Sequence, residues 1–275
     1  MKKLHVYKYQ GAGNDFVILD NRRGDIVLTP REINRLCDRR FGIGADGLMT
    51  LALDAGGRCT MHYYNADGSE GEMCGNGARC FTLFAHHLGL TEGGRLRFLA
   101  TDGPHEATLC SGGDAAGEIE LGMIPVDAIR PVGDGWFLNT GVPHYVEFVD
   151  AVDAVDILAR GRALRYDTAH FPQGTNVNFA QLLGDGRIRM RTYERGVENE
   201  TLACGTGATA VAVTANFVHQ PAVERFALEL PGGRLQVQFR RTGGPSYTDI
   251  RLTGPARRVF SGIFHETALP ETLEK

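Results

Sequence analysis

Two short segments of this 275-residue chain place a cysteine directly before Gly-x-Gly-Ala and a helix-forming stretch. The first is MCGNGA at Cys74, and the second is ACGTGA at Cys204. A cysteine at a helix N-terminus lies in the positive potential of unpaired backbone N–H groups, which lowers the pKa of its thiol. The glycines let those N–H groups approach an anion closely. Each segment therefore predicts an acid or base beside a carboxylate-binding site.

The similarity of the two segments extends upstream of the cysteines. MHYYNADGSEGEMCGNGA begins at Met61, and MRTYERGVENETLACGTGA begins at Met190. The methionine precedes the cysteine by 13 positions in the first segment and by 14 in the second. Both read as a strand, a polar turn, a cysteine and a helix. One structural unit used twice predicts a chain of two similar halves.

Two such units facing one substrate would suit inversion at a carbon next to a carboxylate. One thiolate would remove the α-proton, and a thiol on the opposite side would deliver a proton to the other face. Negative charge then moves onto the carboxylate, where the N–H groups of the helix ends would stabilise it.

The positions of the lysines limit the choice of cofactor. Lysine occurs only as Lys2, Lys3, Lys8 and Lys275. Pyridoxal phosphate needs an internal Schiff-base lysine, for which Lys8 is the one faint candidate. Amino-acid chemistry is therefore expected to proceed without a cofactor.

The cysteine spacing argues against a metal site. No C-x-x-C occurs, so the usual zinc spacing is absent and no metal is expected. The remaining cysteines are predicted to be buried packing residues: Cys37, Cys59, Cys80 and Cys110.

Three other functions stay open at this point. GTGATA at 205–210, with Glu224 further on, fits a dinucleotide-binding fingerprint, although ENETLA before it is a poor buried strand. A non-catalytic small-molecule binding protein is the second possibility. Cysteine-based acyl transfer, with His144 as the partner of Cys74 or Cys204, is the third.

The composition is that of an ordinary globular protein. The chain is 43% hydrophobic and 23% charged, with a formal net charge of −4, so binding to nucleic acid or an anionic membrane is not expected. No apolar run of about 18 residues occurs, and the N-terminus does not read as a signal peptide. The expected location is the cytoplasm.

Predicted strands outnumber predicted helices, and their spacing argues against regular βαβ units. The stretch TPRE has the form of a capping box and predicts a helix from Pro30 to about Arg40. Helices are also predicted after Cys74, ending near Gly89, and after Cys204. Strands are predicted at 4–9, 15–20, 47–53, 58–64, 95–101, 105–110, 117–123, 144–150, 175–182, 187–193, 224–230, 234–240 and 247–252.

Motifs along nearly the whole chain resemble those of the diaminopimelate epimerase family, in the same order. They are GAGNDFVILD, GIGADG, NADGSEGEMCGNGARC, FPQGTNVNF, YERGVENETLACGTGA and LTGPARRVF. The paired MCGNG and ACGTG are the most specific of them.

The resemblance implies a cofactor-independent epimerase that interconverts LL- and meso-diaminopimelate in lysine and peptidoglycan-precursor synthesis. It implies an α/β (α+β) fold of two pseudo-symmetric domains, each a curved, mostly antiparallel sheet around a central helix, with the active site between them. The expected domains are 1–118, with a C-terminal segment of about 264–275, and 119–263. A homodimer is expected, because members of the family are often homodimers.

The resemblance also assigns residues by position. Cys74 and Cys204 match the two acid/base thiols, and His144 and Glu194 match residues that support catalysis. The residues that match substrate-binding positions are Asn14, Asn65, Gly75, Asn76, Asn176, Glu194, Arg195, Gly205 and Thr206.

Two positions depart from the family pattern. Val142 stands where many members have asparagine, and Gly47 stands where some have glutamine. A valine side chain neither donates nor accepts a hydrogen bond. The departures leave a second substrate open, and a racemase of another amino acid such as histidine is the alternative.

Overall fold

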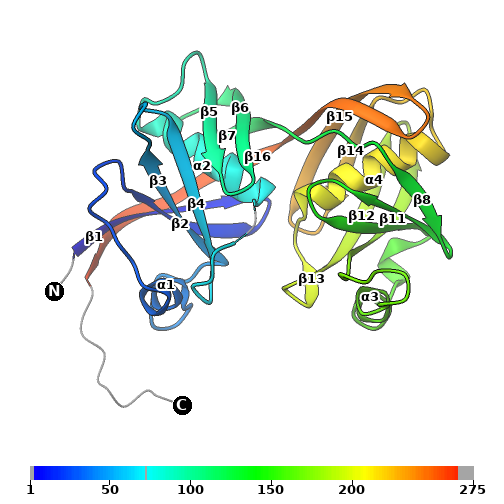
Figure 1. Ribbon diagram of the computed structural model, residues 1–275, viewed down its shortest axis with the longest axis horizontal. Helices are drawn as coiled ribbons and strands as arrows, with labels where there is room; N and C mark the ends of the chain where they lie inside the picture. Colours follow the sequence, from blue (N-terminus) through cyan, green and yellow to red (C-terminus); the bar gives the residue numbers. More distant parts are fainter. Residues whose placement is uncertain (1–2, 72, 266–275) are drawn as a thin grey trace.

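The structure is a computed structural model, and it describes residues 3–71 and 73–265. Its strands curl around one central helix in each half of the molecule (Figure 1). These helices are α2 (Gly75–His87) and α4 (Gly205–Val218). The predicted α+β fold of two pseudo-symmetric halves is confirmed.

The first half contains seven strands and helices α1 and α2 among the described residues. Its elements are β1 (Lys3–Gly11), β2 (Asn14–Asp20), α1 (Pro30–Cys37), β3 (Gly47–Leu53), β4 (Cys59–Asn65), α2, β5 (Arg95–Ala100), β6 (Gly103–Gly112) and β7 (Ala116–Gly122).

The second half begins after a short linker and ends with the longest strand. Its elements are β8 (Ile129–Val132), β9 (Gly135–Asn139), β10 (Pro143–Phe148), the 3-10 helix η1 (Val152–Ala154), α3 (Ile157–Arg165), β11 (Asn176–Gly184), β12 (Arg187–Glu194), β13 (Asn199–Thr201), α4, β14 (Arg225–Leu230), β15 (Gly233–Gly243) and β16 (Ser246–His265).

The two halves repeat one pattern of strand pairing. From β1 to β6, the pairs β2–β3 and β4–β5 are parallel, and the pairs between them are antiparallel. From β9 to β15, the pairs β10–β11 and β12–β14 are parallel in the equivalent places. The central helix follows the fourth strand of the pattern in both halves, so the duplicated sequence corresponds to a duplicated structure.

Each central helix is buried on nearly all sides. α2 is buried from Gly75 to Ala85, and α4 is buried almost completely from Gly205 to Asn216. The two main hydrophobic clusters of the protein surround these helices. Because the helices lie in the cores, packing on every side holds their N-terminal ends in place.

α1 begins as predicted and ends three residues early. Thr29 accepts a hydrogen bond from the Glu32 backbone N–H at 3.3 Å, and the Glu32 carboxylate accepts one from the Thr29 N–H at 2.6 Å, which completes the capping box. The helix stops at Cys37 rather than near Arg40. Asp38 causes the stop, because its carboxylate accepts from the N–H groups of the next turn.

Other differences from the sequence prediction lie in the second half. β8, β9, β13 and α3 were not predicted. In α3, Gly161 interrupts the helical pattern because a Cβ there would lie 2.5 Å from Cβ of Tyr193, so only glycine fits. The strand predicted at 247–252 runs on to His265.

β16 belongs to both halves. Its first part pairs with β15 as far as Thr253, and its second part, from Gly254 onward, pairs with β7 and β1. The orange-red ribbon of β16 passes from one half to the other in Figure 1. We propose that the division between the halves within this strand falls near Gly254; residues 266–275 of the expected C-terminal segment lie outside the described residues.

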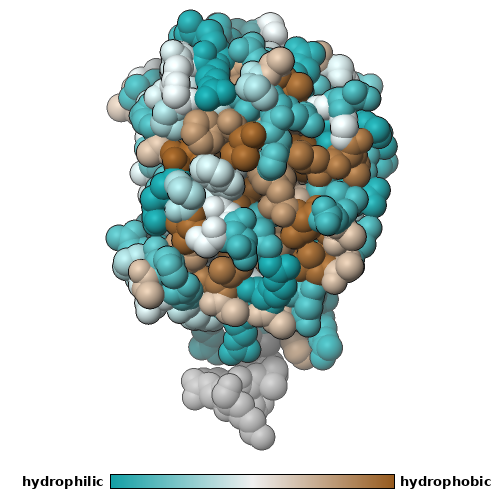
Figure 2. All heavy atoms as spheres, turned by 90° about the vertical axis from the view of Figure 1, so that its right-hand side faces the viewer, coloured by the Kyte–Doolittle hydropathy of each residue, from teal (hydrophilic) through white to brown (hydrophobic). Residues whose placement is uncertain are grey.

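The surface of the second half mixes hydrophilic and hydrophobic residues (Figure 2). Among residues 3–71 and 73–265, none of the helices has the length and apolar character needed to span a membrane.

Candidate active site

The N-terminal ends of α2 and α4 meet at the junction of the two halves (Figure 1). A Cβ on Gly75 would lie 3.9 Å from Cα of Gly205, and a Cβ on Gly205 would lie only 2.8 Å from Leu252 Cδ2. A helix leaves the N–H groups of its first turn without partners inside the helix. The glycines therefore allow two sets of such N–H groups to point into one small volume.

Cys74 is the N-cap residue of α2, and its sulfur accepts a hydrogen bond from Gly77 N–H at 3.5 Å. The thiol faces Asn14 Oδ1 at 3.6 Å. That oxygen also accepts from Asn76 Nδ2 at 3.3 Å. Asp46 fixes the orientation of Asn14 by accepting from its Nδ2 at 2.7 Å. The structure thus brings together three residues that the sequence analysis named separately.

Cys204 has the equivalent place on α4. Its sulfur accepts from Gly207 N–H at 3.4 Å and lies 3.4 Å from the Thr206 hydroxyl. Thr140 donates to the carbonyl oxygen of Thr206 at 2.9 Å. Gly207 must be glycine, because a Cβ there would lie 2.5 Å from Asn178 Oδ1.

The net direction of the thiol pKa differs from the sequence prediction. Burial raises the pKa of Cys74 to about 11, and the N–H groups of Gly77 and Asn76 lower it by less. Burial also raises the pKa of Cys204, where the nearby Glu194 and Cys74 add to the rise. The predicted lowering is therefore wrong for the net pKa, although the helix N–H groups act in the expected direction.

Glu194 lies close enough for its charge to raise the pKa of both thiols. Its carboxylate accepts a hydrogen bond from the Thr201 hydroxyl at 2.8 Å. Burial raises the pKa of Glu194 itself, and the Thr201 hydrogen bond partly offsets that rise. Glu194 thus places a partly buried carboxyl group beside the pair of cysteines.

His144 is fully buried and neutral. Burial lowers its pKa to about 3, and the charge of Arg195 adds to this effect. Asn178 Nδ2 lies 3.1 Å from His144 Nδ1, so Nδ1 is the acceptor and the proton is on Nε2. Nε2 has no hydrogen-bond partner among the described residues, which leaves a buried N–H donor unused.

The remaining predicted residues form a smaller group in the second half. Asn176 donates to the Pro143 carbonyl at 3.1 Å and accepts from the Arg195 N–H at 2.8 Å. The Arg195 guanidinium donates to the Gln173 carbonyl at 3.2 Å. Asn65 stays apart from this group: it is exposed and donates to Ser69 Oγ in its own turn at 3.1 Å.

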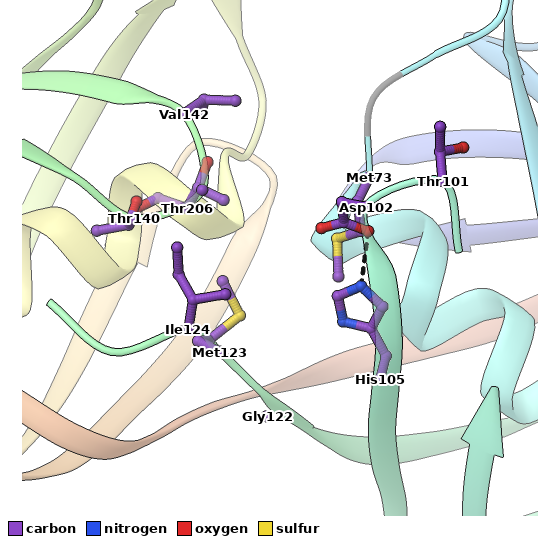
Figure 3. Close-up of a pocket in the computed structure, with 11 residues that line it drawn as sticks. Met73, Thr101, Asp102, His105, Gly122, Met123, Ile124, Thr140, Val142 and Thr206 are labelled. Atoms are coloured by element: carbon purple, nitrogen blue, oxygen red, sulfur yellow. Dashed lines mark hydrogen bonds and ion pairs between the residues drawn. The ribbon is translucent and has the colours of Figure 1, made fainter. Parts of the chain in front are cut away.

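A cavity of about 240 Å³ lies between the halves (Figure 3). Thr206 and Val142 line it from the second half, and Met73 lines it from the first. Asp102 and His105 form a hydrogen bond of 2.7 Å in the same wall. Because the Thr206 hydroxyl contacts Cys204, the cavity ends one side chain away from that thiol.

Tyr63 explains why residue 47 is glycine. A Cβ on Gly47 would lie 2.5 Å from Tyr63 Cε2, and one on Gly71 would lie 2.4 Å from Tyr63 Cδ1. The ring packs edge-on against Phe16 with centroids 6.0 Å apart. The tyrosine ring therefore occupies the space that a larger side chain at position 47 would need.

Lys8, the faint Schiff-base candidate, is engaged elsewhere. Its ammonium group pairs with Asp15 at 2.7 Å and also donates to the Gly44 carbonyl. Within residues 3–71 and 73–265, no three His, Cys, Asp or Glu side chains are grouped as metal ligands would be.

The context of GTGATA does not match that of a dinucleotide site. The preceding strand, β13, has three residues and pairs antiparallel with β12. A dinucleotide fingerprint follows a buried strand of a parallel βαβ unit.

Sequence reasoning missed two buried polar residues of the site, Asn178 and Arg79. Asn178 donates to the Tyr145 carbonyl at 2.9 Å and accepts from Thr192 at 3.0 Å. Asn178 could have been predicted from its position two residues after Asn176, because residues two apart lie on the same face of a strand.

Replacing Gly47 by alanine is expected to lower the free energy of unfolding by about 1–3 kcal/mol, because the new methyl group overlaps the Tyr63 ring. Chemical denaturation measures the change. Gly262→Ala is the matched control, since a Cβ there meets nothing within 4 Å. Equal stability of Gly47→Ala and the parent chain would contradict the proposed steric role of Tyr63.

Comparison with known sequences gives one consistent result. The model of the family described as diaminopimelate epimerase matches residues 6–124 and 136–259. A diaminopimelate epimerase of Flavobacterium psychrophilum is 41% identical over 261 residues, which cover 94% of this chain and 98% of the relative. One of Chlorobaculum tepidum is 39% identical and covers 92% of this chain and 98% of its own length.

Solved structures share the fold at low sequence identity. A PhzF-family phenazine biosynthesis protein of Bacillus anthracis has a TM-score of 0.76 at 14% identity, covering 97% of this chain and 100% of its own. A hydroxyproline epimerase of Agrobacterium vitis, with bound trans-4-hydroxy-L-proline, has a TM-score of 0.68 at 16% identity, covering 95% and 92%. From the family match and the two long, closely similar relatives, this chain belongs to the diaminopimelate epimerase family.

Proposed function

We propose that the protein is a cofactor-independent epimerase that interconverts LL- and meso-diaminopimelate by proton transfer between Cys74 and Cys204. The observation that carries this proposal is the meeting of two cysteine-capped helices at Gly75 and Gly205. The names of the relatives supply the substrate.

In this proposal, the carboxylate next to the reacting carbon binds at the joined helix ends. The first-turn N–H groups of Gly75 and Asn76 on one side, and of Gly205 and Thr206 on the other, would donate to it. Proton removal moves negative charge onto this carboxylate. The hydrogen bonds from the same N–H groups therefore become stronger in the transition state.

The two thiols would exchange roles with the direction of reaction. One cysteine, as thiolate, takes the α-proton, and the other, as thiol, gives its proton to the opposite face of the carbon. The reaction consumes neither oxidant nor reductant, and the enzyme ends with the proton on the other sulfur.

Substrate charge would counter the high thiol pKa values. The α-ammonium group brings a positive charge into a buried site, where charges interact strongly. Glu194 is the carboxyl group placed to pair with it, since its charge reaches both sulfurs. The unused Nε2–H of His144 supports a role in orienting polar groups of the reacting complex.

Epimerisation in D₂O tests the reaction and the paired thiols together. The parent enzyme should place deuterium on the α-carbon, and Cys74→Ala or Cys204→Ala should each lower the rate about 10³-fold, as expected for loss of an acid/base group. Cys110→Ala is the matched control because this thiol is exposed and lies on β6. Full activity of either Cys74→Ala or Cys204→Ala would contradict the two-thiol mechanism.

Val142 bears on the choice of substrate. It lines the cavity together with Thr206, and the polar side chains of that cavity include Thr101, Thr140 and Asp102. We propose that the distal end of diaminopimelate contacts this region without the family's asparagine.

A substrate panel separates diaminopimelate from the alternative amino acids. LL-diaminopimelate should exchange its α-proton, and L-histidine and other L-amino acids should not. Val142→Asn is expected to change KM for LL-diaminopimelate about fivefold, the effect of one hydrogen bond of ~1 kcal/mol, with little change in kcat. Faster turnover of L-histidine than of LL-diaminopimelate would show that the substrate assignment is wrong.

We further propose a cytoplasmic homodimer. Val259 and Ile263 on β16 are 55% and 61% exposed. This apolar strip, made of Val259 and Ile263, lies beside β1, because Ile263 pairs with His5 and Ser261 pairs with Tyr7.

Replacing Ile263 by lysine should convert a dimer to a monomer, because it places a charge within the apolar strip. Light scattering after size-exclusion chromatography measures the mass. Leu158→Lys, which alters an equally exposed apolar residue on α3, is the control and should stay dimeric. A dimer that survives Ile263→Lys and Val259→Lys together would place the interface elsewhere.

A further inference from the structure

Arg79 is a fully buried arginine, with an exposed fraction of 0%. It lies on α2, one turn after Gly75. Its guanidinium donates to Asn76 Oδ1 at 2.8 Å, to the Gly75 carbonyl at 3.2 Å and to the Pro255 carbonyl at 3.3 Å. All three acceptors are neutral, although a buried charge is normally paired with an opposite one.

The guanidinium fixes the orientation of the Asn76 side chain. Since Asn76 Oδ1 accepts from Arg79, its Nδ2 must point the other way. There it donates to the Ala203 carbonyl at 2.9 Å and to Asn14 Oδ1 at 3.3 Å. One amide therefore links α2 to the residue before Cys204 and to the asparagine that faces Cys74.

The guanidinium also lies directly behind the meeting point of the helices. A Cβ on Gly205 would lie 3.9 Å from Arg79 Nη1, and one on Gly254 would lie 3.1 Å from Nε. The anionic or acidic groups near it are Cys74 and Cys80 on α2 and Glu118 on β7. Around Cys74, burial and the Glu194 charge oppose the thiolate, and the Arg79 charge favours it by less.

We propose that Arg79 is a positioning residue that orients Asn76 and provides a fixed positive charge behind the two helix ends. This charge stabilises a thiolate at Cys74 and a carboxylate bound between the helices. The carboxylate part of this inference rests on the proposed function, whereas the thiolate part concerns the substrate-free protein.

The test compares Arg79→Met, which removes the charge and keeps most of the volume, with Arg79→Lys, which keeps the charge. Thr82→Val is the matched control: Thr82 is equally buried on α2, and its hydroxyl donates to the Ala78 carbonyl of the same helix at 2.8 Å. The first readout is the rate of alkylation of Cys74 by iodoacetamide at about pH 8, where a thiol of raised pKa is mostly protonated. Mass spectrometry of the separated peptides follows each cysteine, and exposed Cys110 serves as the internal reference.

Arg79→Met should slow alkylation of Cys74 about tenfold relative to Cys110, because loss of one nearby opposite charge raises a pKa by about one unit. Arg79→Lys should keep the parent rate within about twofold, and Thr82→Val should not change it. In the epimerisation assay, Arg79→Met should shift the acidic limb of the pH–rate profile to higher pH by about one pH unit. Arg79→Lys should leave the pH of the acidic limb unchanged. It should lower kcat about tenfold, because lysine lacks the guanidinium N–H donors that hold the Asn76 side chain.

An unchanged Cys74 rate in Arg79→Met would overturn the proposal, as would equal slowing in Arg79→Met and Arg79→Lys, which would indicate packing alone. Arg79→Gln replaces Arg79→Met if the latter does not fold, with the same expected slowing. Alkylation needs no turnover, so an inactive parent enzyme that still shows the tenfold slowing would reject the proposed function and leave the role of Arg79 at the thiol intact.

Discussion

The contact between the ends of α2 and α4 is the constraint on which the site depends. Two helix N-termini repel each other electrostatically, because both carry partial positive charge. Here the glycines Gly75 and Gly205 remove the side chains that would separate them, and the Asn76 amide bonds one helix to the chain of the other. The resulting pocket of N–H groups has its lowest energy when an anion fills it.

Burial of the thiols raises their pKa, whereas the N–H groups of the helix ends lower it, so the two effects change thiol reactivity in opposite directions. Removal from water raises the pKa of both cysteines, which favours the thiol over the thiolate. The same exclusion of water strengthens every interaction with a charged ligand. In the proposed function, the thiols become reactive when a molecule with both an ammonium and a carboxylate group binds.

The parts of the fold that were predictable are those that the sequence repeats or caps locally. The doubled cysteine-glycine unit predicted two halves and two buried helices, and Thr29 with Glu32 marked the start of α1. α3 was missed because Gly161 is set by a contact with Tyr193, which lies far along the chain.

The site residues divide in the same way. The motifs of Asn14, Asn76 and Cys74 marked these residues in advance, and the structure brings them together. Arg79 and Asn178 were missed, and each has a partner far along the chain: the Pro255 carbonyl for Arg79 and the Tyr145 carbonyl for Asn178. The pKa direction of the thiols was also out of reach, because it depends on how deeply the sulfur atoms are buried.

Because β16 pairs with strands of both halves, the first half cannot complete its sheet alone. The last residues of β16 close the gap between β7 and β1, and the second half must be synthesised before that gap can close. Severed at the linker, the first half would present two open sheet edges, which invite association with other chains.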